Sequence, residues 1–534
     1  MTRQDQKPGA GGGPAKPPMT HPRAVAAIWP DKPAVIDGET GESISYGELV
    51  DRADRCANLI ADLGVPAGAT IAIFVENGLR FAELCWAAKN SGLYYVCIST
   101  QLNTDDLAYV FDNCGARLLF VSSRTAAAAQ AVLDRLDHSP TIVITDGLRP
   151  GFIPYETALP EMPANPLDGR SAGASVLYSS GTTGRPKAVR PPLDGRAPEV
   201  PPRRHVVLVD RFGFAADMVF INPGPLYHAA PLRMMMSVLR MGGTAVVFRK
   251  FDGAAVLRAI ERWRGTHGFF VPTMFVRMMR LRDDGFPCDV SSMRCAIHGA
   301  APCGRPVKEA MLAWWGPVVH EIYGGTEGMG QTTILAEEWL NHPGSVGKPP
   351  PGCTVRILDE AGRELGPNET GLIYMFNGNR FEYLGDPEKT QATQKPDGFA
   401  TFGDIGHLDE DGYLYLTDRQ THMIISGGVN IYPQEAENLL IAYPGIDDVA
   451  VIGVPNEEFG EEVKAIVVAR SWPTDPAALE RDILDWCRAR LSAIKCPRSV
   501  DFVQELPRSE AGKLLKREIR APYWEGHATL IGSR

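Results

Sequence analysis

Tyr178-Ser-Ser-Gly-Thr-Thr-Gly-Arg-Pro-Lys187 places hydroxyl side chains, two glycines and a lysine directly after the mostly apolar run Ala174–Leu177. The run predicts a buried strand, and the following loop can wrap a polyphosphate. Glycines let the backbone approach an anion closely, hydroxyls donate hydrogen bonds, and the lysine adds positive charge. The candidate phosphate ligands are Ser179, Ser180, Gly181, Thr182, Thr183, Gly184 and Lys187. The spacing is not that of a Walker A loop; a plain surface loop is the alternative.

The length and charge of the chain limit its architecture and partners. With 534 residues it exceeds the ~250–300 residues at which single hydrophobic cores stop growing, so we expect more than one domain. Hydrophobic residues make up 44% and charged residues 22%, as in ordinary globular proteins. A net charge of −10 argues against a nucleic-acid partner. The basic pair Arg203-Arg204 follows two prolines and is expected in a solvated loop.

Several absences in the sequence point to a cytoplasmic protein. It shows no secretory signal and no apolar run of the ~18 residues that a membrane span needs. Its ten cysteines form no C-x-x-C pair, so we expect reduced thiols. Residues 1–18 are rich in Gly, Pro and Lys and predict a disordered tail.

Apolar runs alternate with helical patterns in the first part of the chain, which predicts an α/β layer with parallel strands. Strands are expected at 34–36, 70–74 and 116–121, and helices at 49–63 and from an N-cap at Thr104 through Phe111. The alternation resumes after the phosphate loop, with strands expected at 205–209, 244–248, 295–297 and 318–319 and a helix at 254–263.

The pattern changes again toward the C-terminus. From Thr354 it favours β-hairpins, with Asp411-Gly412 as a hairpin turn. After Arg419 a small α+β unit is expected, with helices at 433–443 and 476–491 and strands at 449–454 and 463–468. The natural domain boundary is therefore Asp418 to Thr421.

Three further motifs follow the phosphate loop: Tyr323-Gly-Gly-Thr-Glu327, Phe402-Gly-Asp404 with Asp418-Arg419, and Gly512-Lys513. Together the four resemble the ordered signatures of the adenylate-forming superfamily of acyl-CoA synthetases, adenylation domains and luciferases. The likeness runs from about residue 30 to 520 and is greatest to fatty- or aryl-acyl-CoA synthetases. It implies ATP, Mg²⁺ and coenzyme A as reactants, with acyl-AMP formed first and the acyl group then transferred to coenzyme A.

The resemblance also implies an α/β fold: a large N-terminal domain of α/β subdomains plus a β-rich subdomain, followed by a small mobile α+β C-terminal domain. The expected divisions are a tail at 1–18, the large domain at 19–418, a hinge at 419–421 and the small domain at 422–534. By this resemblance, the small domain rotates about Thr421 between the two half-reactions.

Residue roles on the nucleotide side are likewise implied by the resemblance. Thr326 would contact the α-phosphate and Glu327 would bind Mg²⁺, with an exposed loop carboxylate as the alternative. Asp404, with Arg419, would bind the ribose hydroxyls; a hairpin salt bridge is the alternative. Gly299, Ala300 and Ala301 would form a flat wall for the adenine, and Tyr323 would stack or pack against the same base. Gly324 and Gly325 are further candidate nucleotide ligands.

Lys513 matches the lysine that neutralises charge between the acyl carboxylate and the α-phosphate; a solvated lysine at a helix start is the alternative. Rotation of the small domain would remove Lys513 and bring Ser426, Gly427 and Gly428 to the site. His228 is the candidate gate of the acyl pocket, unless it is a buried structural histidine. Met234–Met236 and Met241 would line an apolar pocket or simply fill the core.

The acid is therefore expected to be apolar and larger than acetate, and a homodimer is left open. The sequence departs from the usual pattern at Phe402, where the superfamily has threonine, at Ala188, where it has glycine, and at Thr421, where it has Asp or Lys. The proline-rich segment 190–202 cannot be helical throughout. Two rival functions are an adenylating enzyme that loads a carrier protein and an inactive nucleotide-binding relative.

Overall fold

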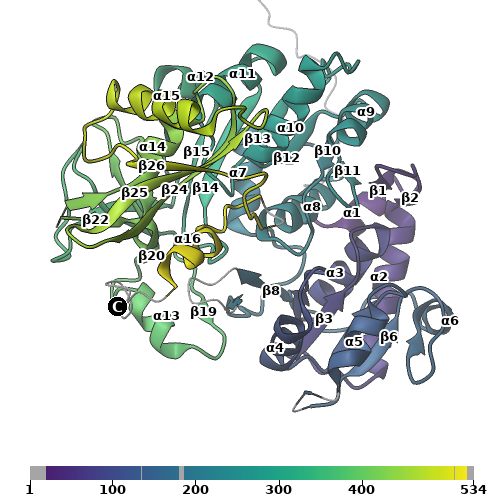
Figure 1. The fold of residues 1–534 in the computed structure, drawn as a ribbon. Helices are drawn as coiled ribbons and strands as arrows, with labels where there is room; N and C mark the ends of the chain where they lie inside the picture. Colours follow the sequence, from purple (N-terminus) through teal and green to yellow (C-terminus); the bar gives the residue numbers. More distant parts are fainter. Residues whose placement is uncertain are drawn as a thin grey trace, which may run out of the picture.

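The computed structural model describes residues 20–133, 135–136, 138–179, 186–427, 429–509 and 512–525 (Figure 1), and only the backbone of Ser179 and Gln420. The tail expected at 1–18 lies outside these residues. No helix in the described ranges is long and apolar enough to cross a membrane.

An eight-stranded sheet carries the first α/β half. Its strands are, in spatial order, β19 (Glu382–Tyr383), β9 (Lys187–Arg190), β8 (Ala174–Ser179), β4 (Tyr94–Cys97), β3 (Thr70–Phe74), β5 (Leu118–Val121), β6 (Thr141–Ile144) and β7 (Ile153–Pro154). The strands from β8 to β7 pair in parallel, as the alternation of elements predicts. The helices of this half are α2 (Tyr46–Asp62), α3 (Leu79–Asn90), α4 (Thr104–Cys114), α5 (Ala126–Leu133) and α6 (Tyr155–Ala158), with the turn η1 (Leu159–Glu161).

A second eight-stranded sheet forms the other α/β half. Its order is β15 (Gln331–Ile334), β14 (Val319–Gly324), β13 (Cys295–His298), β12 (His267–Phe270), β10 (Val219–Asn222), β11 (Thr244–Val247), β1 (Pro33–Asp37) and β2 (Ser43–Ser45). Its helices are α1 (Pro22–Ala26), α7 (Arg203–Phe212), α8 (Ala229–Met241), α9 (Gly253–Trp263), α10 (Pro272–Asp283), α11 (Arg305–Trp315) and α12 (Ala336–Asn341). One continuous hydrophobic core joins the two halves.

The β-rich subdomain is a five-stranded antiparallel sheet. Its order is β16 (Ser345–Gly347), β21 (Leu414–Arg419), β20 (Ala400–Leu408), β18 (Gly371–Phe376) and β17 (Thr354–Leu358), and α13 (Pro387–Thr393) lies between β19 and β20 in the chain. The hairpin turn expected at Asp411-Gly412 joins β20 to β21, with Gly412 at φ +80.

The small C-terminal unit has hydrophobic clusters of its own. It contains β22 (Ile424–Ser426), β23 (Val429–Ile431), α14 (Pro433–Leu440), β24 (Ile446–Asn456), β25 (Gly460–Ala469), α15 (Pro476–Arg488), β26 (Ser499–Phe502) and α16 (Lys516–Trp524). A short turn, η2 (Gln420–His422), precedes it in the chain. An ion pair between Arg280 and Asp447, 3.0 Å long, links it to the rest of the chain. The fold class expected from the sequence is confirmed.

Three local expectations are wrong. Residues 205–209 form part of helix α7 and not a strand, because His205, Leu208 and Phe212 are buried at helical spacing while Val206 stays 49% exposed. The basic pair Arg203-Arg204 consequently lies in the first turn of this helix. Helix α4 is capped by Asn103, whose side chain accepts a hydrogen bond from the Asp106 amide at 2.9 Å, and not by Thr104.

We predict that Gly347→Ala destabilises the protein more than Gly344→Ala. Both glycines have φ near +90, but a Cβ at Gly347 would overlap the Thr333 carbonyl, whereas a Cβ at Gly344 meets nothing within 4 Å. The free energy of unfolding should fall by about 1–3 kcal/mol more in Gly347→Ala. Denaturant unfolding of both variants measures this difference, and equal losses would contradict it.

Candidate active site

A buried aspartate is held between two sheets. Asp404, in β20, is 7% exposed, and its Oδ2 accepts a 2.7 Å hydrogen bond from the hydroxyl of Tyr323 in β14. Its Oδ1 lies 3.0 Å from Nε of Arg419, its partner across the β20–β21 ladder. Burial raises the pKa of Tyr323 well above its usual value, so the phenol remains a hydrogen-bond donor. Motif residues from β14, β20 and β21 therefore contact one another. The salt bridge within the β20–β21 hairpin, between Asp404 and Arg419, is one of these contacts.

Glu327 lies beside this group and is not a free loop carboxylate. It is half-buried, and its Oε1 accepts a 2.8 Å hydrogen bond from the hydroxyl of Tyr383. Lys187 lies 5.9 Å from the centre of the same tyrosine ring. Burial and the neighbouring Lys389 lower the pKa of Lys187 to about 8, against the field of Glu327. Lys187, at the C-terminal end of the phosphate loop, thus lies near the Tyr323–Glu327 motif.

Lys513 reaches the same place from the small domain. Burial lowers its pKa to about 8, and Arg419 acts in the same direction while Asp404 and Glu327 oppose it. Gly512 precedes it at φ +75, and a Cβ there would lie 2.6 Å from Oγ1 of Thr273, at the start of α10. The loop is therefore packed on the large domain, and Lys513 is half-buried rather than a solvated surface lysine.

The residues expected to contact the adenine, Gly299 to Ala301, come directly after β13 in the chain. A Cβ at Gly299 would lie 2.5 Å from the Ile322 carbonyl, so only glycine allows β13 and β14 to approach this closely here. Ala300 has φ +68, a left-handed conformation that a non-glycine residue adopts at a cost. Such strained residues concentrate at binding sites, which agrees with a role for this turn in the site.

Phe402, which departs from the usual pattern, is accommodated by a glycine. Its ring packs edge-to-face on Tyr323 with centroids 6.1 Å apart. A Cβ at Gly325 would overlap the Phe402 ring. The phenylalanine thus packs against the Tyr323–Glu327 motif without displacing Asp404.

His228 lies at the N-cap of α8, with its ring 4.8 Å from that of Tyr227. Burial lowers its pKa to about 4, so the imidazole is neutral at physiological pH. Its Nε2 is buried and has no hydrogen-bond partner among the described residues. Its role as a gate remains a prediction.

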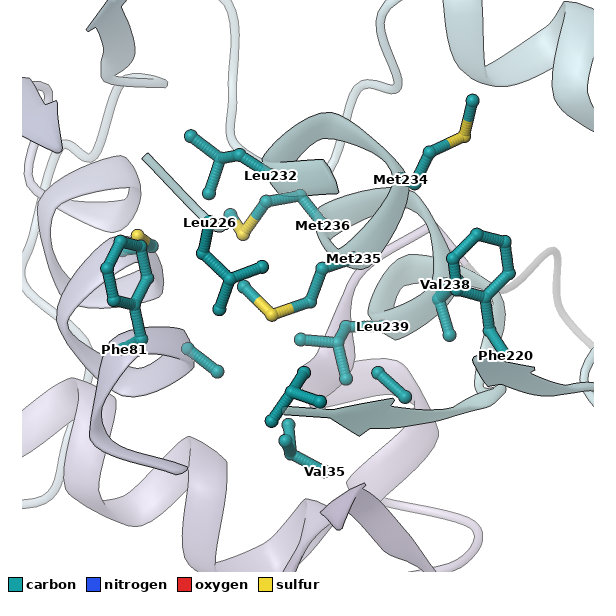
Figure 2. Packing of buried hydrophobic residues seen from close by; sticks show 14 of the residues in the cluster. Val35, Phe81, Phe220, Leu226, Leu232, Met234, Met235, Met236, Val238 and Leu239 are labelled. Atoms are coloured by element: carbon teal, nitrogen blue, oxygen red, sulfur yellow. The ribbon is translucent and has the colours of Figure 1, made fainter. Parts of the chain in front are cut away.

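The methionines of α8 fill the core. Met234, Met235 and Met236 are 5%, 0% and 7% exposed. Figure 2 shows Met235 and Met236 packed among Leu226, Leu232 and Leu239, with Met234 on another side of the helix. Met234–Met236 had been expected either to line an apolar pocket or to fill the core, and they fill the core. Met241, at the end of the same helix, is half-buried.

Some expected ligands are not described. Ser180, Gly181, Thr182, Thr183, Gly184 and Gly428 lie outside the described residues, and Ser179 is described only as the end of β8. Ser426 is buried in β22, and the amide of Gly427 donates to the Phe459 carbonyl at 2.8 Å, both within the small domain.

The residues present fit a magnesium ion bound together with phosphates. Mg²⁺ usually takes one or two protein carboxylates and completes its shell with water and substrate phosphate. The described residues contain no group of three His, Cys, Asp or Glu side chains that could hold a metal by themselves. Glu327, oriented by Tyr383, would be the protein ligand.

Two side chains outside the four motifs also contact the Tyr323–Glu327 motif. Tyr383 orients Glu327 from β19, and Arg233 in α8 donates from Nη2 to the Thr326 carbonyl at 2.7 Å. Neither lies in one of the four motifs, so no local pattern indicates its role.

Family comparisons agree with this site. The model described as AMP-binding enzyme matches residues 23–379, and that described as AMP-binding enzyme C-terminal domain matches residues 435–513. The chain belongs to the AMP-binding enzyme family. The superfamily resemblance of its motifs is thereby confirmed.

Two curated members of the AMP-binding family match nearly the whole chain. Feruloyl-CoA synthase of an Amycolatopsis species is 33% identical over 502 residues, which cover 93% of this chain and 96% of that protein. Long-chain-fatty-acid–CoA ligase FadD13 of Mycobacterium tuberculosis is 30% identical over 510 residues, covering 94% and 97%.

A solved member of the AMP-binding family is similar in fold. ATP-bound MatB of Rhodopseudomonas palustris gives a TM-score of 0.81 at 30% identity, covering 94% of this chain and 99% of that one. Its apo form gives 0.70. The higher similarity to the ATP-bound form agrees with the position of Lys513 beside Glu327 and Asp404.

We predict that Tyr383→Phe weakens magnesium dependence more than nucleotide binding. The variant removes the hydroxyl that orients Glu327, and loss of such a supporting hydrogen bond typically costs about 10-fold or more in metal affinity. The Mg²⁺ concentration for half-maximal pyrophosphate release should rise accordingly. Tyr374→Phe, on the neighbouring sheet, is the control and should match the wild type; an unchanged Mg²⁺ requirement in Tyr383→Phe would contradict the assignment.

Proposed function

We propose that this AMP-binding enzyme is an ATP-dependent acid–CoA ligase. Feruloyl-CoA synthase and FadD13, which match nearly the whole chain, are CoA ligases by name, and such enzymes use ATP, Mg²⁺ and coenzyme A. The observation that carries the proposal is the convergence of Lys513 with Glu327 and Asp404. The charges of both carboxylates act on Lys513 of the C-terminal unit, where a carboxylic acid would be joined to the α-phosphate.

In the first half-reaction, an oxygen of the acid's carboxylate bonds to the α-phosphorus of ATP, and the bond to the β-phosphate oxygen breaks. Lys187 and the phosphate loop hold the leaving pyrophosphate, and Thr326 contacts the α-phosphate. Lys513 offsets the negative charge where the two anions approach each other. The ribose hydroxyls donate to Asp404, which Tyr323 and Arg419 keep in place. Magnesium, when bound by Glu327 and the phosphates, further offsets the charge of the triphosphate.

In the second half-reaction, the coenzyme A thiolate attacks the acyl carbon, and AMP leaves with the electron pair of the cleaved bond. The small domain rotates about the 419–421 hinge between the steps, so that Ser426 and Gly427 replace Lys513. The acid has an apolar body larger than acetate. The division into domains at 418 and 422, the residue roles, the cytoplasmic location and a homodimer remain predictions.

Pyrophosphate release tests the function. The enzyme with Mg-ATP and a panel of aliphatic and aromatic acids should release pyrophosphate without coenzyme A, and adding coenzyme A should release AMP. Formation of ADP and phosphate alone would exclude the reaction class. AMP release with a carrier protein but not with free coenzyme A would favour the carrier-loading rival, and release with neither would favour the inactive relative.

Lys513→Ala should separate the two half-reactions. Removing the charge should slow acyl-AMP formation ~10²–10³-fold, the usual cost of a charge-stabilising group. Supplied acyl-AMP and coenzyme A should still react at nearly the normal rate, because Lys513 would be remote in that step. Single-turnover assays of each half-reaction give the two rates; equal losses in a folded variant would refute the domain rotation.

The adenylation rate should fall as the pH rises through about 8. The pKa values of Lys513 and Lys187 are both lowered to about 8, chiefly by burial, and each lysine is charged only below its pKa. The profile of kcat/KM reports the free enzyme, so its logarithm should fall with a slope of about −2 at high pH. Lys513→Arg and Lys187→Arg should each reduce that slope to about −1, since arginine keeps its charge. Unchanged slopes in both variants would show that neither lysine controls the rate.

A further inference from the structure

A tight turn at residues 325–328 follows β14 and carries Thr326 and Glu327, the proposed α-phosphate and magnesium ligands. The amide of Gly328 donates to the carbonyl of Gly325 at 3.2 Å, which closes the turn. Gly328 has φ +68, a left-handed conformation that favours glycine. The two proposed ligands therefore lie next to each other on a turn with a defined backbone path.

Two asparagines hold the end of this turn. The side-chain amides of Asn377 and Asn379 both donate to the Gly328 carbonyl, at 3.0 and 2.8 Å. The Asn377 side chain is itself fixed, because its Oδ1 accepts from the backbone amide of Asn379 at 3.0 Å. Nη1 of Arg203 also donates to the Asn377 carbonyl at 2.8 Å. Since a carbonyl oxygen has two lone pairs, the Gly328 carbonyl is fully hydrogen-bonded by these two side chains.

Arg233, in α8, holds the middle of the turn. Its Nη2 donates to the Thr326 carbonyl at 2.7 Å, and a Cβ at Gly328 would lie 4.0 Å from the same nitrogen. Burial lowers the pKa of Arg233 to about 9, so the guanidinium stays charged at neutral pH. Its buried Nε has no hydrogen-bond partner among the described residues. A charged donor makes the stronger kind of hydrogen bond, so Arg233 holds the Thr326 carbonyl firmly.

Holding this carbonyl also fixes the amide on the same peptide. A peptide bond is planar and trans, so the Thr326 carbonyl and the Glu327 N–H point in opposite directions. The Glu327 N–H therefore points away from the guanidinium of Arg233. Neither this N–H nor that of Thr326 donates a hydrogen bond within the part of the chain that the structure describes. Successive backbone donors of this kind can bind an anion.

Resting on the proposed function, we propose that Arg233 is a positioning residue for the α-phosphate of ATP. It acts through the peptide between Thr326 and Glu327: with the carbonyl held, the Thr326 hydroxyl and the Glu327 N–H keep the orientation in which they bind the α-phosphate. Without Arg233 this peptide can rotate, while the turn stays attached through the Gly328 carbonyl and through the hydrogen bond from Tyr383 to Glu327. The loss is therefore one of orientation at the α-phosphate.

Sulfur-substituted ATP reports this orientation. ATPαS, in which sulfur replaces one non-bridging oxygen of the α-phosphate, exists as two diastereomers, and fixed donors at that phosphate favour one of them. The wild type should prefer one diastereomer by about 10–100-fold in kcat/KM for pyrophosphate release, the usual value of a hydrogen bond to a charged group. Arg233→Met keeps the length of the side chain without its donors and should reduce this preference by about tenfold or more.

Arg240→Met is the matched control. Arg240 lies on the same helix, and its Nη2 likewise donates to a backbone carbonyl, that of Pro198, at 2.9 Å. It is 2% exposed, so its loss should lower the temperature of thermal unfolding. The preference between the ATPαS diastereomers should nevertheless match that of the wild type. A merely structural role for Arg233 would make the two variants alike, with lowered stability and an unchanged preference.

Other outcomes overturn the inference. A wild type that does not distinguish the diastereomers, or a preference that survives in Arg233→Met, excludes the proposed role. Equal losses of preference in Arg233→Met and Arg240→Met would exclude it as well, because the effect would then belong to α8 as a whole. Circular dichroism establishes that the variants are folded; if Arg233→Met is not, Arg233→Gln takes its place with the same expected result.

Calorimetric titration with each ATPαS diastereomer, in the absence of an acid, separates this inference from the proposed function. A binding preference that is lost in Arg233→Met, without pyrophosphate release from any acid, would leave the role of Arg233 standing and refute the ligase activity. Pyrophosphate release with the same diastereomer preference in both proteins would refute the role of Arg233 and leave the activity standing.

Discussion

The hydrogen-bonded group of Tyr323, Asp404 and Arg419 is the interaction on which the site depends. It joins a strand of the second α/β sheet to a hairpin of the β-rich subdomain, next to the η2 turn. A buried carboxylate with only one partner would be costly, whereas here each oxygen has a donor or a cation. The aspartate side chain is therefore held in place, and its charge acts on Lys513 of the C-terminal unit.

Much of the fold could be predicted because burial and local pattern agree in most elements. Strand β3 has the predicted limits, and β11, β13, β24 and β25 differ from theirs only at the ends. Helix α7 is the exception: its valines favour a strand, but the spacing of its buried residues and the left-handed Gly213 at its end produce a helix. Whether residues 205–209 form a helix or a strand depends on which of their side chains pack on the core. The pattern of these five residues alone does not contain this information.

The candidate site also contains residues that the sequence predicts and residues that only the structure reveals. Tyr323, Glu327, Asp404 and Lys513 could be predicted because each lies in a short motif whose residue types match the required chemistry. Tyr383 and Arg233 could not, because they reach the Tyr323–Glu327 motif through contacts over long sequence separations. Phe402 illustrates the same limit: the sequence shows the departure, but only the structure shows that Gly325 leaves room for the ring.

The arrangement of charge follows from the chemistry of the substrates. The chain carries a net charge of −10, which would repel anions at long range. Several of its cations nevertheless lie near the Tyr323–Glu327 motif: Lys187 interacts with Lys389 and Glu327, and Arg233 donates to the Thr326 carbonyl. Burial is the largest cause of the lowered pKa of Lys187 and of Lys513, so the protein holds these two positive charges at a cost. In the proposed reaction both substrates are anions, so their binding offsets that cost, and Lys513 acts where the two anions approach each other.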